Sequence, residues 1–75
     1  MSRYIHLEDC TLITVSDKAV CVEYNGERHW LPFSQLASDE EEKIQNLLEK
    51  EAPCRGVTLS VTAWICEKKG IETDE

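Results

Sequence analysis

The residues of this chain that could do chemistry are four cysteines, two histidines and a run of acids. The cysteines are Cys10, Cys21, Cys54 and Cys66, and no two of them form a C-x-x-C pair. Structural zinc sites usually contain at least one close pair of ligands, so this spacing does not favour a metal. Reduced cysteine behaves as a small apolar residue. The sequence therefore predicts buried or half-buried free thiols and no cofactor.

Nucleophilic catalysis would need one of these thiols beside a base, and His6 and His29 are the two imidazoles available. The chain has no glycine-rich phosphate loop, no H-E-x-x-H and no G-x-S-x-G. It also has no recognisable third group that would orient a Cys–His pair. We therefore expect no enzymatic activity. A zinc-stabilised module that uses Cys10, Cys21 and His29 on neighbouring strands is the metal-binding alternative.

The acids give the strongest charge signal. The chain has 15 Asp and Glu against 8 Lys and Arg, a formal net charge of −7. Direct nucleic-acid binding needs clustered cations that displace counterions, and it is therefore not favoured. The charge suits solubility and also a protein partner with a basic surface. The candidate partner contacts are Glu40, Glu41, Glu42 and Glu49, together with Trp30.

A helix over residues 39–50 is expected to position the glutamates. Ser38 fits the N-cap and Glu41 the third helical position of a capping box. The acids of the first turn lie at the positive end of the helix dipole. The apolar stripe consists of Ile44, Leu47 and Leu48. Because this stripe is narrow, the helix should dock by one side and leave its acidic side to water or to a partner.

Alternating apolar and β-branched residues predict the strands. Asn25-Gly26 is the strongest short hairpin signal, because a type I′ turn needs positive φ at both central residues. The predicted strands are residues 10–15, 19–24, 27–31 and 57–62, with Tyr4–Leu7 as a candidate for a further strand. The first three form an antiparallel meander.

Trp30 stands where the third strand of this meander ends. Pro32 cannot donate to a ladder, so the strand must end there or lie at an edge. Residues 33–36 then fit a single helical turn. The hairpin places Trp30 opposite Cys21 or Val22. We expect Trp30 to close the open end of a small core, with its indole N–H held at the rim.

A short helix over residues 63–69 completes the pattern. Thr62 is its expected N-cap, Gly70 its left-handed end, and Ile71 folds back on it. The fold class is α+β, a twisted antiparallel sheet of four to five short strands with one helix of about 12 residues and a short C-terminal helix. Partial closure into a small barrel is an open alternative. The chain is one domain, 1–75, with frayed ends at 1–3 and 72–75.

The predicted core draws on both faces of some strands, because a curled sheet buries residues on either side. It consists of Leu12, Val15, Val20, Val22, Trp30, Leu31, Leu36, Ile44, Leu47, Leu48, Val57, Leu59, Val61, Trp64 and Ile65.

Two stretches resemble small proteins of phages and related mobile elements. The string K-A-V-C-V-E-Y-N-G-E-R-H-W-L-P-F-S-Q resembles their pattern K-A-hydrophobic-x-V-E-x-x-G-x-x-x-W-[IL]-P-[KR]-S-Q, and V-T-L-S-V-T-A-W-I-C-E-K-K-G-I resembles their ending. Together they cover residues 14–36 and 57–71, about half of the chain. Phe33 departs from the pattern by replacing Lys or Arg, and residues 38–56 form an enlarged segment. The resemblance implies a phage or prophage setting and a fold, and no established activity.

These observations predict a non-enzymatic acidic interaction module of phage or mobile-element origin. Residues 1–9 lack the apolar run of a signal peptide, and no stretch approaches the ~20 apolar residues that cross a bilayer, so we expect it in the cytoplasm of the bacterial host, away from membranes. An acidic face can occupy a surface that evolved to hold phosphates. The expected role is therefore to bind and inhibit a nucleic-acid-processing or host-defence complex, in the manner of anti-CRISPR proteins. Two alternatives stay open: single-stranded nucleic-acid binding across the sheet through Trp30 and Tyr24, and a small structural subunit of a larger assembly.

Overall fold

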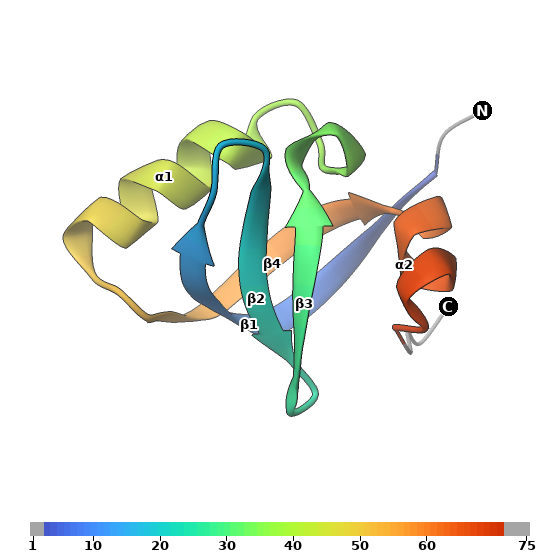
Figure 1. Ribbon diagram of the computed structural model, residues 1–75, viewed down its shortest axis with the longest axis horizontal. Coiled ribbons are helices and arrows are strands. Elements are labelled where there is room, and N and C mark those ends of the chain that lie inside the picture. The colour runs from blue at the N-terminus through green and yellow to red at the C-terminus, as the bar shows by residue number, and fades with distance from the viewer. Residues whose placement is uncertain (1–2, 72–75) are drawn as a thin grey trace.

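An open antiparallel sheet and two α-helices make up the computed structural model, which describes residues 3–71 (Figure 1). In chain order the elements are β1 (Tyr4–Val15), β2 (Ala19–Tyr24), β3 (Glu27–Pro32), the 3-10 turn η1 (Phe33–Gln35), α1 (Glu40–Lys50), β4 (Cys54–Thr62) and α2 (Ala63–Lys69). The sheet order is β3-β2-β1-β4. The predicted α+β class is confirmed, and the sheet does not close into a barrel. The two helices lie at opposite ends of the long axis (Figure 1).

The first strand is longer than predicted. The two segments expected at residues 4–7 and 10–15 are one bent strand, β1, which pairs with β4 from Tyr4 to Leu12 and with β2 from Thr11 to Val15. Asp9 has a φ of 61° and lies inside the irregularity between Leu7 and Cys10. A second irregularity lies between Leu12 and Thr14. Irregularities of this kind bend a strand and raise its twist, which lets β1 serve both halves of the sheet.

The hairpin between β2 and β3 forms as predicted. Asn25 and Gly26 have φ values of 53° and 78°, as a type I′ turn requires. Trp30 lies opposite Cys21 in the resulting register, one of the two positions expected. Leu31 points to the other face and is fully buried.

The core lies on the inner face of the bent sheet. Its buried members are Ile5, Leu7, Cys10, Leu12, Val20, Val22, Leu31, Leu36, Ile44, Val57, Leu59, Val61, Ile65, Cys66 and Ile71. Leu47 and Leu48 are half-buried against it. Ile5 and Leu7 were absent from the predicted core, because residues 4–7 were only a candidate strand and had no assigned place in the sheet.

Three residues expected in the core are exposed instead. Val15 is 36% exposed, Trp30 47% and Trp64 55%. Val15 is the last residue of its strand, Trp64 lies in the first turn of α2, and Trp30 lies on the outer face of β3. The prediction that Trp30 closes the core was therefore wrong, because strand alternation turns Leu31 rather than Trp30 inward.

The two helices begin differently. The predicted capping box of α1 was wrong: the N-cap is Asp39 rather than Ser38, and no side chain caps the helix. The cap of α2 is as predicted, since Thr62 Oγ1 accepts a hydrogen bond from the Ile65 N–H at 3.2 Å. Gly70 ends α2 with a φ of 69°, and the buried Ile71 folds back to donate to the Cys66 carbonyl at 2.9 Å.

The predicted fraying concerns mostly residues 1–2 and 72–75, which lie outside the described part of the chain. Arg3, the remaining residue of that prediction, is attached to α2, because its carbonyl accepts a hydrogen bond from the Ala63 N–H at 2.8 Å.

Candidate partner-binding site

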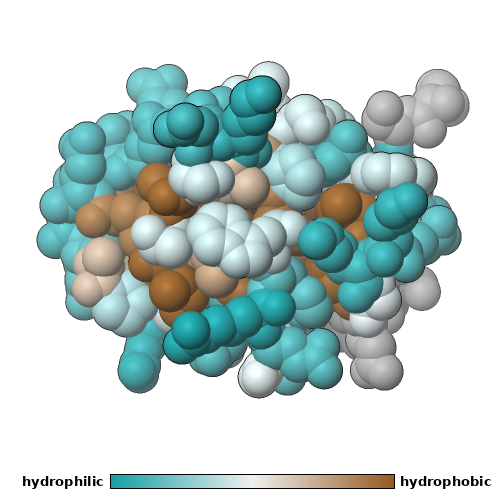
Figure 2. All heavy atoms as spheres, viewed as in Figure 1, coloured by the Kyte–Doolittle hydropathy of each residue, from teal (hydrophilic) through white to brown (hydrophobic). Residues whose placement is uncertain are grey.

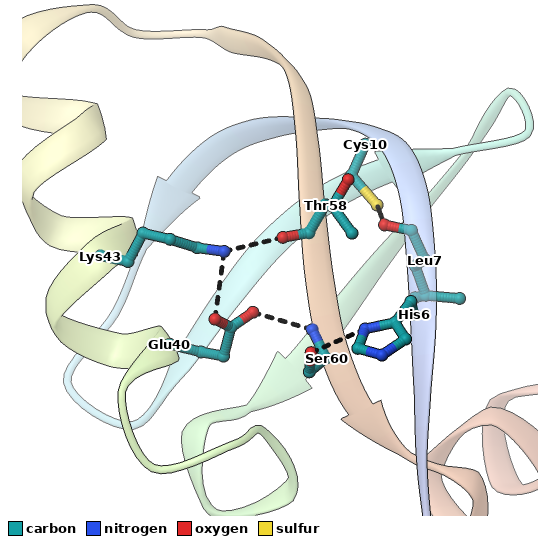
Figure 3. Close-up of polar contacts among 7 residues, drawn as sticks. All are labelled: His6, Leu7, Cys10, Glu40, Lys43, Thr58 and Ser60. Carbon is teal, nitrogen blue, oxygen red and sulfur yellow. Dashed lines mark hydrogen bonds and ion pairs between the residues drawn. The ribbon is translucent and has the colours of Figure 1, made fainter.

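Glu40, the first of the four candidate glutamates, is turned inward and is only 5% exposed (Figure 3). One carboxylate oxygen accepts a hydrogen bond from the Ser60 N–H at 2.8 Å, and the other lies 3.1 Å from Lys43 Nζ. Lys43 Nζ also donates to the Thr58 carbonyl at 2.8 Å, and the Ala37 N–H donates to the Ser60 carbonyl at 3.0 Å. These groups occupy the outer edge of β4. Glu40 therefore belongs to the framework, and its expected place among exposed partner contacts needs correction.

Ser60 also contacts a histidine. His6 Nδ1 lies 2.9 Å from Ser60 Oγ (Figure 3), and the two residues face each other across β1 and β4. A serine nucleophile would need this base to be oriented by a third group. The nearby carboxylate of Glu40 binds the Ser60 backbone instead. The geometry describes a cross-strand side-chain pair that exchanges one hydrogen bond.

The three ligands of the zinc alternative do not come together. Cys21 pairs with Trp30 across the ladder, whereas His29 pairs with Val22. Successive residues of a strand point to opposite faces, so Cys21 and His29 lie on opposite sides of the sheet and that alternative was wrong. Within residues 3–71 no group of three or more His, Cys, Asp or Glu is placed to hold a metal ion.

The thiols are free, as predicted: three are buried and Cys54 is half-buried. Burial raises the pKa of the Cys10 thiol to about 12, and the carboxylate of Asp9 adds to the rise. Burial also raises the pKa of Cys66, with a further contribution from Glu67. Because the thiolate is the nucleophilic form of cysteine, both thiols are poor nucleophiles at neutral pH.

Glu41 and Glu49, in contrast, line two shallow depressions beside α1. The first has a volume of about 330 Å³ and is lined by Asp17, Lys18, Pro32, Phe33, Ser34 and Glu41. The second has a similar volume of about 330 Å³ and is lined by Val15, Gln45, Leu48 and Glu49. Gln45 Nε2 donates to Glu41 Oε2 at 3.5 Å across one turn of α1, so the two depressions are neighbours. We call the two together the α1 groove.

The α1 groove combines an apolar base with an acidic margin. The apolar residues are Val15, Pro32, Phe33 and Leu48, and the charged residues are Asp17, Lys18, Glu41 and Glu49. Three carboxylates thus stand against one ammonium group. Protein interfaces commonly have this organisation, an apolar centre with a polar rim. Phe33 adds an aromatic ring to the groove.

Trp30 lies on the outward face of β2 and β3, which no helix covers (Figure 1). Cys21, its cross-strand neighbour, is nevertheless only 6% exposed, so flanking side chains must shield it. Figure 2 shows a band of apolar and weakly polar side chains over this face, surrounded by hydrophilic ones. Pro32, two residues after Trp30 on the same face, lines the α1 groove. The Trp30 face therefore leads into the groove.

This placement also bears on nucleic-acid binding across the sheet. Tyr24 follows Val22 on the inner side of the hairpin and packs against the core, whereas Trp30 faces outward. The two rings lie on opposite faces and cannot form one stacking platform. The expectation that both rings lie on one face of the sheet was therefore wrong, because side chains alternate between the two faces along a strand.

Two of the five predicted contacts, Glu41 and Glu49, therefore line the α1 groove, and Trp30 lies on the outer sheet face that adjoins its first depression. Glu42 is exposed on α1 but lines neither depression, and Glu40 is internal. Sequence reasoning missed the apolar part of the site, above all Phe33 and Val15. Neither residue carried a signal in the sequence that would have placed it beside the acids of α1.

The opposite end of the molecule has a second group of exposed rings. Tyr4 is 45% exposed and pairs with Thr62, and Trp64 follows on α2. Lys68 Nζ lies 5.5 Å from the centroid of the Trp64 ring. This is the geometry of a surface cation–π contact.

The chain matches no protein-family model, no curated protein and no solved structure. Among the described residues, no helix has the length and apolar character required to span a membrane.

Proposed function

We propose that this protein is a non-enzymatic interaction module that binds a basic surface on a protein partner through the α1 groove and the adjoining Trp30 face. The supporting observation is the acidic margin of Glu41, Glu49 and Asp17 around an apolar base. A purely solvating helix face would carry the charges without that base. The net charge of −7 adds long-range attraction to a basic partner.

The partner class that fits this chemistry is a nucleic-acid-processing or host-defence complex. Such complexes expose basic surfaces that hold phosphates, and an acidic protein competes for them. The resemblance of residues 14–36 and 57–71 to phage proteins supports a setting in the cytoplasm of a bacterial host, with inhibition in the manner of anti-CRISPR proteins as the biological role. A structural subunit of a larger assembly would use the same surface, and the identity of the partner distinguishes the two roles.

The experiment compares three forms of the protein in affinity capture from a bacterial host lysate. The groove variant carries Glu41→Lys and Glu49→Lys. The matched control carries Glu8→Lys and Glu67→Lys, which change the net charge equally at exposed positions outside the groove. All three should first give the same circular dichroism spectrum and melting temperature.

We expect the wild type and the control to retain one nucleic-acid-processing complex that the groove variant loses. Equal retention by all three forms would refute the groove as the contact surface. Equal loss by both variants would show that only net charge matters. Failure of the wild type to retain any such complex would refute the proposed partner class in that host.

A further inference from the structure

We infer that the α1 groove receives a cationic amphipathic helix of the partner, with two apolar side chains one to two helical turns apart that enter its two depressions. This inference rests on the proposed function and specifies the partner element that the site recognises. It follows from three observations: the spacing of the depressions, the absence of ion pairs at Glu41 and Glu49 among the described residues, and the negative net charge of the molecule.

The spacing comes from α1 itself. Glu41 lines the first depression, and Gln45, Leu48 and Glu49 line the second. Their α1 residues are therefore four to eight positions apart, a rise of about 6–12 Å. Side chains at positions i and i+4, or i and i+7, of a second helix are separated by about 6–10 Å along its axis. A helix that lies along α1 therefore presents one apolar side chain to Pro32 and Phe33 and the next to Val15 and Leu48.

The charges of the groove are available to a ligand. Glu40 is already paired with Lys43, but Glu41 accepts only a side-chain hydrogen bond from Gln45. Within residues 3–71 no cation lies within ion-pair distance of Glu41 or Glu49. Lys or Arg residues that flank the two apolar anchors would face these carboxylates. Ion pairs at a solvent-exposed rim contribute little to affinity, so the apolar anchors supply most of the affinity and the charges fix the orientation.

Other occupants fit less well. A nucleic acid would bring phosphates against three carboxylates. A second copy of this chain could offer Lys68 and Lys69 beside the exposed Trp64, but it also brings a further net charge of −7. That contact would be heterologous and would produce rings or open chains of molecules rather than two-fold dimers. Sedimentation velocity at increasing concentration tests it directly.

The test uses synthetic peptides as probes, at an ionic strength of about 0.15 M. The first peptide has about 14 residues, an average helix length, of leucine and lysine, with leucines at i, i+4 and i+7 on one face. Its isomer has the same composition with the leucines dispersed around the helix. Each is titrated into the 15N-labelled protein, into the groove variant and into the control variant described above.

We expect saturable binding of the first peptide, with amide shift changes concentrated at Val15, Phe33, Gln45 and Leu48. Affinity should fall at least about tenfold, or ~1.4 kcal/mol, in the Glu41→Lys and Glu49→Lys variant. It should change less than about twofold, or ~0.4 kcal/mol, in the control variant. The dispersed isomer should bind at least about tenfold more weakly than the first peptide.

Equal binding of the two peptides, or equal weakening in both variants, would overturn the inference because charge alone would then explain the association. Shift changes elsewhere, absence of saturable binding or concentration-dependent self-association would overturn it as well. In each of these cases, capture of a complex by the wild type and its loss from the groove variant would still support the proposed function. The two failures are therefore distinguishable.

Discussion

Replacement of Glu40 by alanine should destabilise the fold, whereas the same change at the neighbouring Glu41 should not. The carboxylate of Glu40 is buried and accepts the Ser60 N–H at 2.8 Å on the outer edge of β4 (Figure 3). Its removal leaves that backbone donor without a protein partner. Glu41 is exposed, and its carboxylate accepts only a long hydrogen bond from Gln45, at 3.5 Å.

The magnitude follows from the contacts that are lost. A hydrogen bond to a charged acceptor contributes about 1.5–3 kcal/mol, and an unsatisfied buried donor costs a similar amount. The pair with Lys43 adds little, because the lysine is 42% exposed and keeps its bond to the Thr58 carbonyl. We expect a loss of about 2–3 kcal/mol in the free energy of unfolding. For a domain of this size that lowers the melting temperature by roughly 10–20 °C.

Glu41→Ala is the matched control. Both glutamates lie in the first turn of α1, so both substitutions lose a favourable dipole interaction of about 0.3–1 kcal/mol and gain alanine helix propensity. Their difference isolates the contacts of Glu40. Glu40→Gln keeps an acceptor for the Ser60 N–H and should fall between the two.

The assay is thermal and urea unfolding followed by circular dichroism, with hydrogen exchange at the Ser60 amide. That amide should exchange faster in Glu40→Ala and remain protected in Glu41→Ala. Unfolding free energies of the two alanine variants within about 0.5 kcal/mol of each other, the scatter of ordinary surface substitutions, would refute the assignment of Glu40 to the framework.

Three further predictions concern stability. Leu59→Ala should lower the free energy of unfolding by about 2–5 kcal/mol because it empties a fully buried site. Trp30→Ala should lower it by less than about 1 kcal/mol, because Trp30 is exposed. Equal losses in urea unfolding would show that Trp30 contributes to the core. Gly26→Ala should cost about 1 kcal/mol, since its φ of 78° disfavours a Cβ, and an unchanged melting temperature would contradict this. The pKa of the Cys10 thiol is raised from 9.0 to about 12 in the folded protein, so between these pH values the thiol ionises more readily in the unfolded chain. Its contribution to the free energy of unfolding is therefore complete below about pH 9.0 and is lost as the pH rises toward about 12. Above about pH 9.0 the melting temperature should therefore fall less steeply with pH in Cys10→Val than in the wild type. The same dependence of the melting temperature on pH in both proteins would show that Cys10 makes no such contribution.

Local patterns predicted most elements of the fold. The Asn25-Gly26 turn, the Thr62 cap and the left-handed Gly70 each depend on neighbouring residues, and each forms as expected. Alternation along β2 also identified the buried Val20 and Val22. These features could be predicted because the interactions that fix them lie within a few residues of one another in the chain.

The candidate site was predicted only in part. The sequence placed Glu40, Glu41, Glu42 and Glu49 on one helix, but it did not distinguish the buried Glu40 from its exposed neighbours. The partner of Glu40 is a backbone N–H of β4, 20 residues farther along the chain. No local signal reports such a contact. The apolar part of the groove was missed for the same reason, since the two depressions join residues of α1 to residues near the ends of β1 and β3.

The sequence by itself thus determined the acidic charge, the hairpin, the two helices and most of the buried side chains. Tertiary structure decided that β1 bends to pair with two strands, that Trp30 faces outward, and that Glu40 secures the edge of β4 while Glu41 borders the groove. Helix and strand propensities and apolar alternation depend on residues that are only a few positions apart in the sequence. Strand register and helix docking depend on how distant apolar faces are buried together, and they decide which of several similar side chains meets solvent.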